Sequence, residues 1–185
     1  MIYSNLVMET KKNMQKVRHL AIMLLIGCIV SVSTSMSFYY NTLIGKKAKD
    51  FVMEDQFSKE HSWEKFSGKP TVLLLGDREG SKFTDNWSKP LFARYGNTIN
   101  LVAMADVSSV PFFLKGFIRG KFKDTYTTPI LMDWDGETVE YYDIQKNVPT
   151  FIAIDKQGIV RAHLSGKGTA EDLAKAYNAV QSILQ

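Results

Sequence analysis

Few residues in this chain of 185 are of the types that carry nucleophilic, redox or metal chemistry. Its single cysteine is Cys28, which lies in an apolar segment near the N-terminus. His61 and His163 lie far apart in the sequence and show no spacing typical of a metal site. The Asp-Trp-Asp-Gly turn over residues 133–136 lacks the glutamate that a calcium loop requires, so it is interpreted as the end of a strand. The sequence therefore predicts no metal site and no cofactor.

Charged residues follow the apolar run TVLLLGD, residues 71–77. Asp77, Arg78 and Glu79 lie together at the end of this predicted strand, where α/β proteins place their sites. Two carboxylates can perform acid–base catalysis. A solvated turn with one local ion pair is nevertheless the preferred interpretation, and no catalytic residue is assigned here.

The first 40 residues form a leader. A basic stretch, KKNMQKVRH, precedes residues 20–40, which include no charged residue. Three outcomes remain open: an uncleaved membrane anchor, which needs about 20 apolar residues, a signal peptide cleaved after a small residue, or lipidation at Cys28. The third rests on Leu-Ile-Gly-Cys, which resembles a lipoprotein cleavage box. A cysteine merely placed in a hydrophobic helix is the preferred interpretation of Cys28.

The charge distribution indicates where the chain lies. Four basic residues and one acidic residue give the leader +3 of the total net charge of +4, which leaves +1 for residues 41–185. The pI of about 9.0 is therefore no argument for nucleic-acid binding. By the positive-inside rule, residues 41–185 are expected in the periplasm or on the outer face of the inner membrane of a bacterial cell envelope.

The remaining residues alternate between apolar strands and helical patterns, which predicts one α/β domain over residues 41–185. The apolar residues of the helix expected from Thr84 to Tyr95 are predicted to lie on one face, with Pro90 producing a kink. A Thr169 to Asp172 capping box predicts the C-terminal helix. The expected strands cover residues 48–55 (a strand or an extended arm), 71–77, 97–107, 128–136, and a hairpin from Pro149 to Gly166.

This order of elements resembles the thioredoxin fold, in its redoxin branch of peroxiredoxins and TlpA or ResA-type thiol reductases. The resemblance is carried by GKPTVLLL and by TTPILMDWDGETVEYYDIQKNVPTFIAIDKQGIVRAHLSG, and it covers about three quarters of the chain. It implies a three-layer fold with a central mixed sheet flanked by helices, preceded here by an N-terminal hydrophobic helix.

Thiol reductases of this type carry a Cys-x-x-Cys pair after the strand that TVLLLGD matches. Counting from the strand places the first cysteine near Ser81, and counting back from Pro90 places the pair at Lys82 and Asp85. The turn reads Ser81, Lys82, Phe83, Thr84 and Asp85, so neither register contains a sulfur. Thiol–disulfide exchange requires an attacking thiolate, and no thiol-based enzyme activity is expected.

The chain is most similar to the YtfJ family, exported bacterial proteins of redoxin fold that also lack the cysteine pair. The similarity rests on the turn LLLGDREGSKFTDNW, on an Asp-x-Ser-Ser-x-Pro stretch over residues 106–111, and on the late strand, DKQG turn, strand and helix. Some members of that family have been labelled transcriptional regulators. The predicted export and the nearly neutral domain argue against that role here.

Two surfaces are candidates for binding. Val148 and Pro149 match the redoxin loop whose proline is cis, which implies an exposed backbone that pairs with a substrate polypeptide. The second surface is SSVPFFLKGFIRGKFKD, residues 108–124, whose basic face could contact anionic lipid. For this stretch, an amphipathic helix with phenylalanines packed on the sheet and lysines in water is the preferred interpretation.

The leading hypothesis is an exported or membrane-tethered domain that binds a protein or peptide of the cell envelope beside Pro149 and the Ser81 to Asp85 turn, without redox catalysis. Membrane contact is expected through the N-terminal segment, and no nucleic acid is expected as a partner. Two alternatives remain: a protein that acts with a cysteine-bearing partner, and a structural or assembly factor of the envelope.

Overall fold

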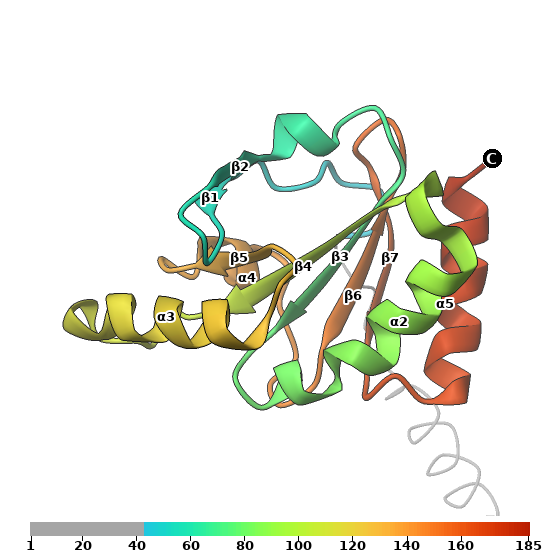
Figure 1. Cartoon of the computed structure of the whole chain (residues 1–185). Helices are drawn as coiled ribbons and strands as arrows, with labels where there is room; N and C mark the ends of the chain where they lie inside the picture. Colours follow the sequence, from blue (N-terminus) through green and yellow to red (C-terminus); the bar gives the residue numbers. More distant parts are fainter. Residues whose placement is uncertain (1–42) are drawn as a thin grey trace, which may run out of the picture. The chain divides into compact units, whose positions relative to one another are not determined.

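The computed structural model describes residues 43–185 of the chain. Its main sheet has five strands in the order β5-β4-β3-β6-β7 (Figure 1). β3, β4 and β5 are parallel, whereas β6 and β7 are antiparallel to their neighbours, so the predicted mixed sheet is confirmed. The strands are Thr71–Gly76 (β3), Asn100–Asp106 (β4), Ile130–Asp133 (β5), Thr150–Ile154 (β6) and Val160–Ser165 (β7).

β3 is the central strand, and all six of its residues are buried. Its side chains alternate between two clusters: Leu73 and Leu75 point to one face of the sheet, and Val72 and Leu74 to the other. The unbroken apolar run predicted a strand covered on both faces, and the structure confirms it.

Helices α2 (Thr84–Tyr95) and α5 (Ala170–Ile183) cover one face, as Figure 1 shows. The opposite face is covered by the small antiparallel pair β1 (Val52–Glu54) and β2 (Glu60–Ser62), the 3-10 turn η1 (Trp63–Phe66) and α4 (Glu137–Tyr141). The stretch predicted over residues 48–55 thus contributes to a separate two-stranded sheet.

The two helices on the first face begin and end as the sequence predicted. In α2, Trp87, Leu91 and Tyr95 are buried, while Phe92 is exposed, contrary to the prediction. Phe92 follows Leu91 by one residue, which rotates it about a quarter turn away from the buried row. α5 begins with the predicted capping box, in which both reciprocal hydrogen bonds of Thr169 are present.

The short helix α4 was not predicted. The Asp133 side chain starts it by accepting hydrogen bonds from the backbone N–H groups of Gly136, Thr138 and Val139. Gly136 adopts a positive φ of 79° immediately before the helix. The turn after β5 was correctly interpreted as the end of a strand. The Asp133 carboxylate at this strand end also caps the first turn of α4.

Helix α3 (Lys115–Thr125) follows the 3-10 turn η4 (Phe112–Leu114) and has no buried residue. Only its Ile118 and Phe122 pack against a small cluster on β4 and β5. Phe113 and Phe117 are exposed, so the preferred interpretation of the 108–124 stretch, with phenylalanines packed on the sheet, is wrong. The cluster at this end of the sheet is narrow and covers only one side of the helix.

Gln56 anchors the connection between α3 and β5 from a fully buried position. Its amide nitrogen donates hydrogen bonds to the carbonyl groups of Tyr126 and Thr128, at 3.2 and 2.8 Å. Its amide oxygen accepts a hydrogen bond from the N–H of Ile130 at 2.8 Å. One side chain thus satisfies three backbone groups of a segment about 70 residues away.

The predicted leader, with its N-terminal hydrophobic helix, its domain boundary after residue 40 and Cys28, lies outside the described residues. Within residues 43–185, no helix has both the length and the apolarity needed to cross a membrane.

We predict that Gln56→Ala lowers the free energy of unfolding by about 2–4 kcal/mol, because three backbone groups of the α3–β5 connection lose the buried side chain that binds them. Gln181→Ala, on the exposed side of α5, is the control and should change it by less than about 0.5 kcal/mol. Urea unfolding of the full chain measures both. Equal midpoints for the two variants would show that the α3–β5 connection does not depend on Gln56.

Candidate functional site

Asp77 links two loops that are far apart in the sequence. It follows β3 directly and is half-buried. One carboxylate oxygen accepts a hydrogen bond from the N–H of Gly80 at 2.6 Å, and the other accepts one from the N–H of Asn147 at 2.9 Å. A single side chain therefore holds the turn after β3 against the loop that leads into β6.

Gly80 brings the same two loops into backbone contact. It is the buried residue of the 3-10 turn η2 (Gly80–Phe83). A β-carbon at position 80 would lie 2.8 Å from the carbonyl carbon of Val148 and 2.9 Å from its oxygen. Glycine is the residue that permits such a close backbone approach. The turn therefore contacts the predicted Val148–Pro149 loop through Gly80.

The peptide bond before Pro149 is trans, because residues 43–185 include no cis peptide bond. The predicted cis-proline is therefore wrong. Asn147, two residues before Pro149, adopts a left-handed φ of +66°. The trans form of an X-Pro bond is the lower in energy by about 0.5–1 kcal/mol.

The backbone carbonyl of Val148 has no partner. Its C=O accepts no hydrogen bond from another residue in the described part of the chain, and the residue is half-buried. Its carbonyl lies against Gly80. Pro149, by contrast, is buried, and its carbonyl accepts a hydrogen bond from the N–H of Gly166 at 3.1 Å. An unpaired backbone group beside a turn is the feature that strand-like peptide binding uses.

Of the five predicted turn residues, Ser81 is fixed within the turn itself. Its N–H donates to the carbonyl of Asp77 and its hydroxyl donates to the carbonyl of Arg78, both at 2.8 Å. Phe83 is half-buried, with the ammonium group of Lys167 5.1 Å from its ring centre. The Ser81 hydroxyl is thus engaged with a carbonyl group and has no base beside it to activate it.

Lys82 and Asp85 are exposed and pair with residues of their own helical segment. Lys82 contacts Glu79 at 2.5 Å, and Asp85 contacts Lys89 at 2.7 Å. Thr84 is the first residue of α2. Exposed ion pairs of this kind contribute little to stability, so these side chains are free to exchange partners.

The structure therefore divides the predicted site. Val148 lies against Gly80, and the preceding Asn147 is bonded to Asp77. No hydrogen bond or ion pair between described residues joins Val148 or Pro149 to the stretch from Ser81 to Asp85. Sequence reasoning had placed Asp77 in a solvated turn. The sequence signal for this contact was an Asp immediately after a buried strand, followed three residues later by a Gly whose N–H it can bind.

The histidines described by the structure have other partners. His61 contacts the Asp55 carboxylate at 2.8 Å, and His163 contacts the carbonyl of Tyr142 at 2.7 Å. The turn at Gly80–Asp85 contains a hydroxyl, an ammonium and a carboxylate group, but no sulfur. These groups suit it to hydrogen bonding with a ligand.

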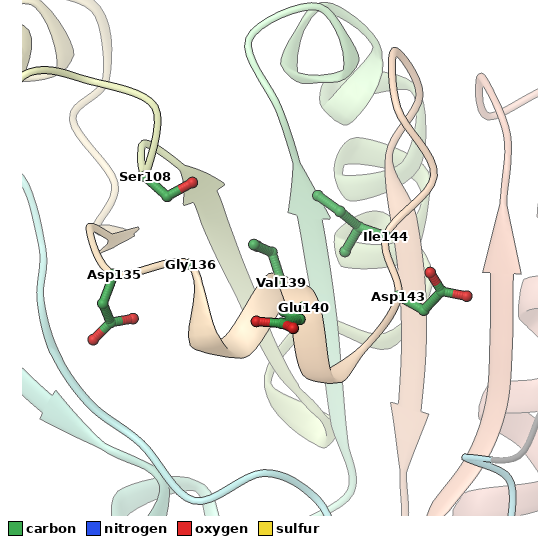
Figure 2. A pocket seen from close by; sticks show the side chains of 7 residues that line it. All are labelled: Ser108, Asp135, Gly136, Val139, Glu140, Asp143 and Ile144. Carbon is green, nitrogen blue, oxygen red and sulfur yellow. The ribbon is translucent and has the colours of Figure 1, made fainter.

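A second feature lies at the carboxyl ends of β4 and β5. A hollow of about 390 Å³ is lined by Ser108, Asp135, Gly136, Val139, Glu140, Asp143 and Ile144. Figure 2 shows Ser108 on the loop after β4, and Val139 and Glu140 on α4. Three of the seven lining residues are acidic, so the hollow disfavours anionic ligands.

Asp133 lies behind this hollow and is buried. Burial raises the pKa of Asp133 to about 6, and the neighbouring Asp135 carboxyl acts in the same direction. The N–H groups of Val139 and Gly136 oppose the shift by donating to the carboxylate. The pKa of Asp135 is lowered, mainly because it accepts the N–H of Glu137.

A mixed five-stranded sheet with helices on both faces, and a turn after the central strand packed against the loop before β6, defines a thioredoxin-like α/β fold. A candidate thiol:disulfide interchange protein DsbE from Chlorobium tepidum is similar, with a TM-score of 0.61, 18% identity, and coverage of 77% of this chain and 98% of that one. The pneumococcal exposed lipoprotein thioredoxin from Streptococcus pneumoniae gives a TM-score of 0.58 at 18% identity, with coverage of 72% and 99%. These likenesses establish the fold alone.

The chain belongs to the AhpC/TSA family, whose profile matches residues 44–163. Curated relatives include the thiol-disulfide oxidoreductase ResA of Bacillus thuringiensis subsp. konkukian, 27% identical over 141 residues, with coverage of 70% of this chain and 74% of the relative. ResA of Geobacillus kaustophilus is 24% identical over 188 residues, with coverage of 92% and 99%. The predicted redoxin relationship is confirmed, and the special closeness to the YtfJ family stays a prediction.

We predict that Gly80→Ala lowers the free energy of unfolding by about 1–3 kcal/mol, because the added methyl group overlaps the Val148 carbonyl. Gly116→Ala in α3 is the matched control, since a β-carbon added at that position meets open space. It should stabilise the chain by about 0.4–1 kcal/mol. Thermal unfolding of the two full-length variants tests the pair, and a Gly80→Ala chain as stable as wild type would contradict the contact.

We predict that the stability of the chain rises by about 1 kcal/mol between about pH 7.5 and about pH 5 through Asp133 alone. The pKa of Asp133 is higher in the folded chain than in the unfolded one, so the folded state binds the proton more tightly. This contribution to stability is fully present below the pKa that Asp133 has in the unfolded chain. It disappears as pH rises through the folded-state pKa of about 6.

Denaturant unfolding of the wild type and of Asp133→Asn at both pH values isolates this effect from that of the histidines. In Asp133→Asn, the change in unfolding free energy between the two pH values should be smaller than in the wild type, whatever the stability of the variant at either pH. Asp85→Asn, which changes an exposed carboxylate, should keep the wild-type slope. Identical slopes for wild type and Asp133→Asn would contradict the raised pKa.

Proposed function

We propose that this protein is an exported or membrane-tethered member of its family that binds an extended peptide segment beside the Val148–Pro149 loop and does not perform thiol–disulfide exchange. One observation carries the proposal: the turn after β3 has no sulfur, yet it is packed against the Val148–Pro149 loop. This packing supports a loop that receives a peptide beside a turn without a thiol.

The contacts of the turn support binding. The C=O of Val148 accepts no hydrogen bond in the described residues, so an extended segment that offers an N–H group completes its hydrogen bonding. The loop is held on its other side by the bond from Asn147 to Asp77, and Pro149 is tied to Gly166. A loop anchored at both ends loses little conformational freedom when it binds.

The side chains around the turn would select the ligand. Lys82 and Glu79 are paired and more than half exposed, and Lys167 lies over the ring of Phe83. These groups present both signs of charge beside one half-buried aromatic ring. They suit a polypeptide of mixed composition more than a strongly charged ligand.

The cellular location is part of the proposal. The leader has the charge pattern of an exported or anchored protein. One structural neighbour carries the words exposed lipoprotein in its name. We propose that this chain likewise acts in the cell envelope, outside the cytoplasmic membrane.

The redox half of the proposal is tested with the full chain and its Cys28→Ser variant. Reduction of insulin disulfides in the presence of dithiothreitol, and consumption of hydrogen peroxide, should stay at the rate of the protein-free control for both proteins, because no thiolate lies at the turn. Because Cys28 is the single cysteine of the chain, a thiol reaction that disappears in the variant comes from the leader. Turnover by the Cys28→Ser chain would overturn the non-redox assignment.

The binding half is tested by amide chemical shifts of the full chain during addition of S-carboxymethylated insulin B chain, an extended peptide without free thiols. The largest shifts are expected at Val148, Gly80 and Asn147, and none at Asn178 on α5. Pro149→Ala should weaken the affinity by about tenfold, equal to about 1.4 kcal/mol. Shifts confined to α5, or an unchanged affinity in the variant, would place binding elsewhere.

A further inference from the structure

Three large aromatic side chains stand exposed at the end of the molecule that carries α3. Phe112 is 85% exposed, Phe113 82% and Phe117 61%. We call these three residues the phenylalanine patch. Figure 1 shows α3 at the opposite side of the domain from α2 and α5. Adjacent exposed aromatic residues on one short segment mark an interaction surface in most soluble proteins.

The patch follows from the way in which α3 packs. Ile118 and Phe122 fill the small cluster at the ends of β4 and β5. Phe117 is rotated by about 100° from Ile118, because successive residues of an α-helix differ by that angle. Phe112 and Phe113 belong to η4, before the helix. The domain covers only the side of α3 that carries Ile118 and Phe122, so the phenylalanine patch stays exposed to solvent.

Polar contacts fix α3 in this orientation. Arg119 forms an ion pair with Glu54 at 2.7 Å and donates a hydrogen bond to the hydroxyl of Ser58 at 2.6 Å. Lys115 and Arg119 lie 5.0 and 6.0 Å from the ring centre of Trp134. The patch is therefore held on a helix that is joined to the domain by several independent contacts.

The charge around the patch is positive. Residues 112–125 include four basic residues, Lys115, Arg119, Lys121 and Lys123, and one acidic residue, Asp124, which gives 4 − 1 = +3. The ammonium groups of Lys115 and Lys121 lie 5.8 and 5.6 Å from the ring centres of Phe112 and Phe117. Each of these two rings thus has a lysine beside it, although the domain as a whole is nearly neutral.

We propose that η4 and α3 dock on the anionic surface of a lipid bilayer. The phenylalanine patch enters the boundary between headgroups and acyl chains, and the lysines contact the anionic headgroups. A second copy of this chain is the less suitable occupant, because the lysines beside the patch of one copy would face those of the other. The surface is distinct from the Val148–Pro149 loop, so the proposal stands independently of peptide binding.

The test uses the full chain with Cys28→Ser, reconstituted in vesicles. A fluorescent probe is attached at Gly116→Cys, an exposed position with open space beside it in α3. The matched control carries the probe at Asn178→Cys on the exposed side of α5. Lipids brominated in the acyl chains quench only a probe that lies at the membrane, so the two positions report which face is docked.

In vesicles of phosphatidylcholine mixed with phosphatidylglycerol, the probe on α3 should be quenched and the probe on α5 should not. The quenching should be lost in pure phosphatidylcholine and at high salt, which screens the lysines. The Phe113→Ser, Phe117→Ser double variant should also lose it while keeping its circular dichroism spectrum, since both side chains are exposed.

Three results would overturn the proposal. The first is an absence of quenching on α3 in anionic vesicles. The second is equal quenching in neutral and anionic vesicles, which would indicate apolar contact without charge recognition. The third is a change in the α3 probe that grows with protein concentration in the absence of lipid, which would assign the patch to contact between copies.

Discussion

The complete burial of β3 is the constraint on which the rest of the domain depends. Side chains on both faces of this strand must be excluded from water, and alternation sends Leu73 and Leu75 to one side and Val72 and Leu74 to the other. The sheet therefore needs a layer of cover on each face. Polar groups can first appear where the strand ends, and Asp77 occupies that position.

Asp77 turns the end of a strand into an organised site. Because its two carboxylate oxygens bind backbone groups of different loops, the turn and the Val148–Pro149 loop behave as one unit. The turn itself contains no sulfur, and its contacts with the loop are hydrogen bonds and backbone packing.

The central strand β3 could be predicted from the sequence because it is a continuous apolar run. Helix α2 could be delimited because Trp87, Leu91 and Tyr95 repeat every four residues before Gly96. The five residues of α4 gave no such signal. Their helix begins at a side-chain cap from Asp133. For α3 the apolar periodicity predicted a helix, but such a repeat does not show which side of the helix packs against the sheet.

The candidate site was less predictable for a related reason. Counting residues placed Ser81 to Asp85 where cysteines would lie, but the loop before β6 is contacted by Gly80, at Val148, and by Asp77, at Asn147. A left-handed residue at Asn147 likewise leaves no periodic pattern. Such contacts depend on how two distant loops meet in space, and this is decided by the whole sheet.

The contact at Gly80 also limits which substitutions the turn after β3 accepts. Any residue with a β-carbon at this position must first displace the backbone of Val148. A substitution at position 80 therefore requires two segments of the chain to change together, the turn after β3 and the loop before β6.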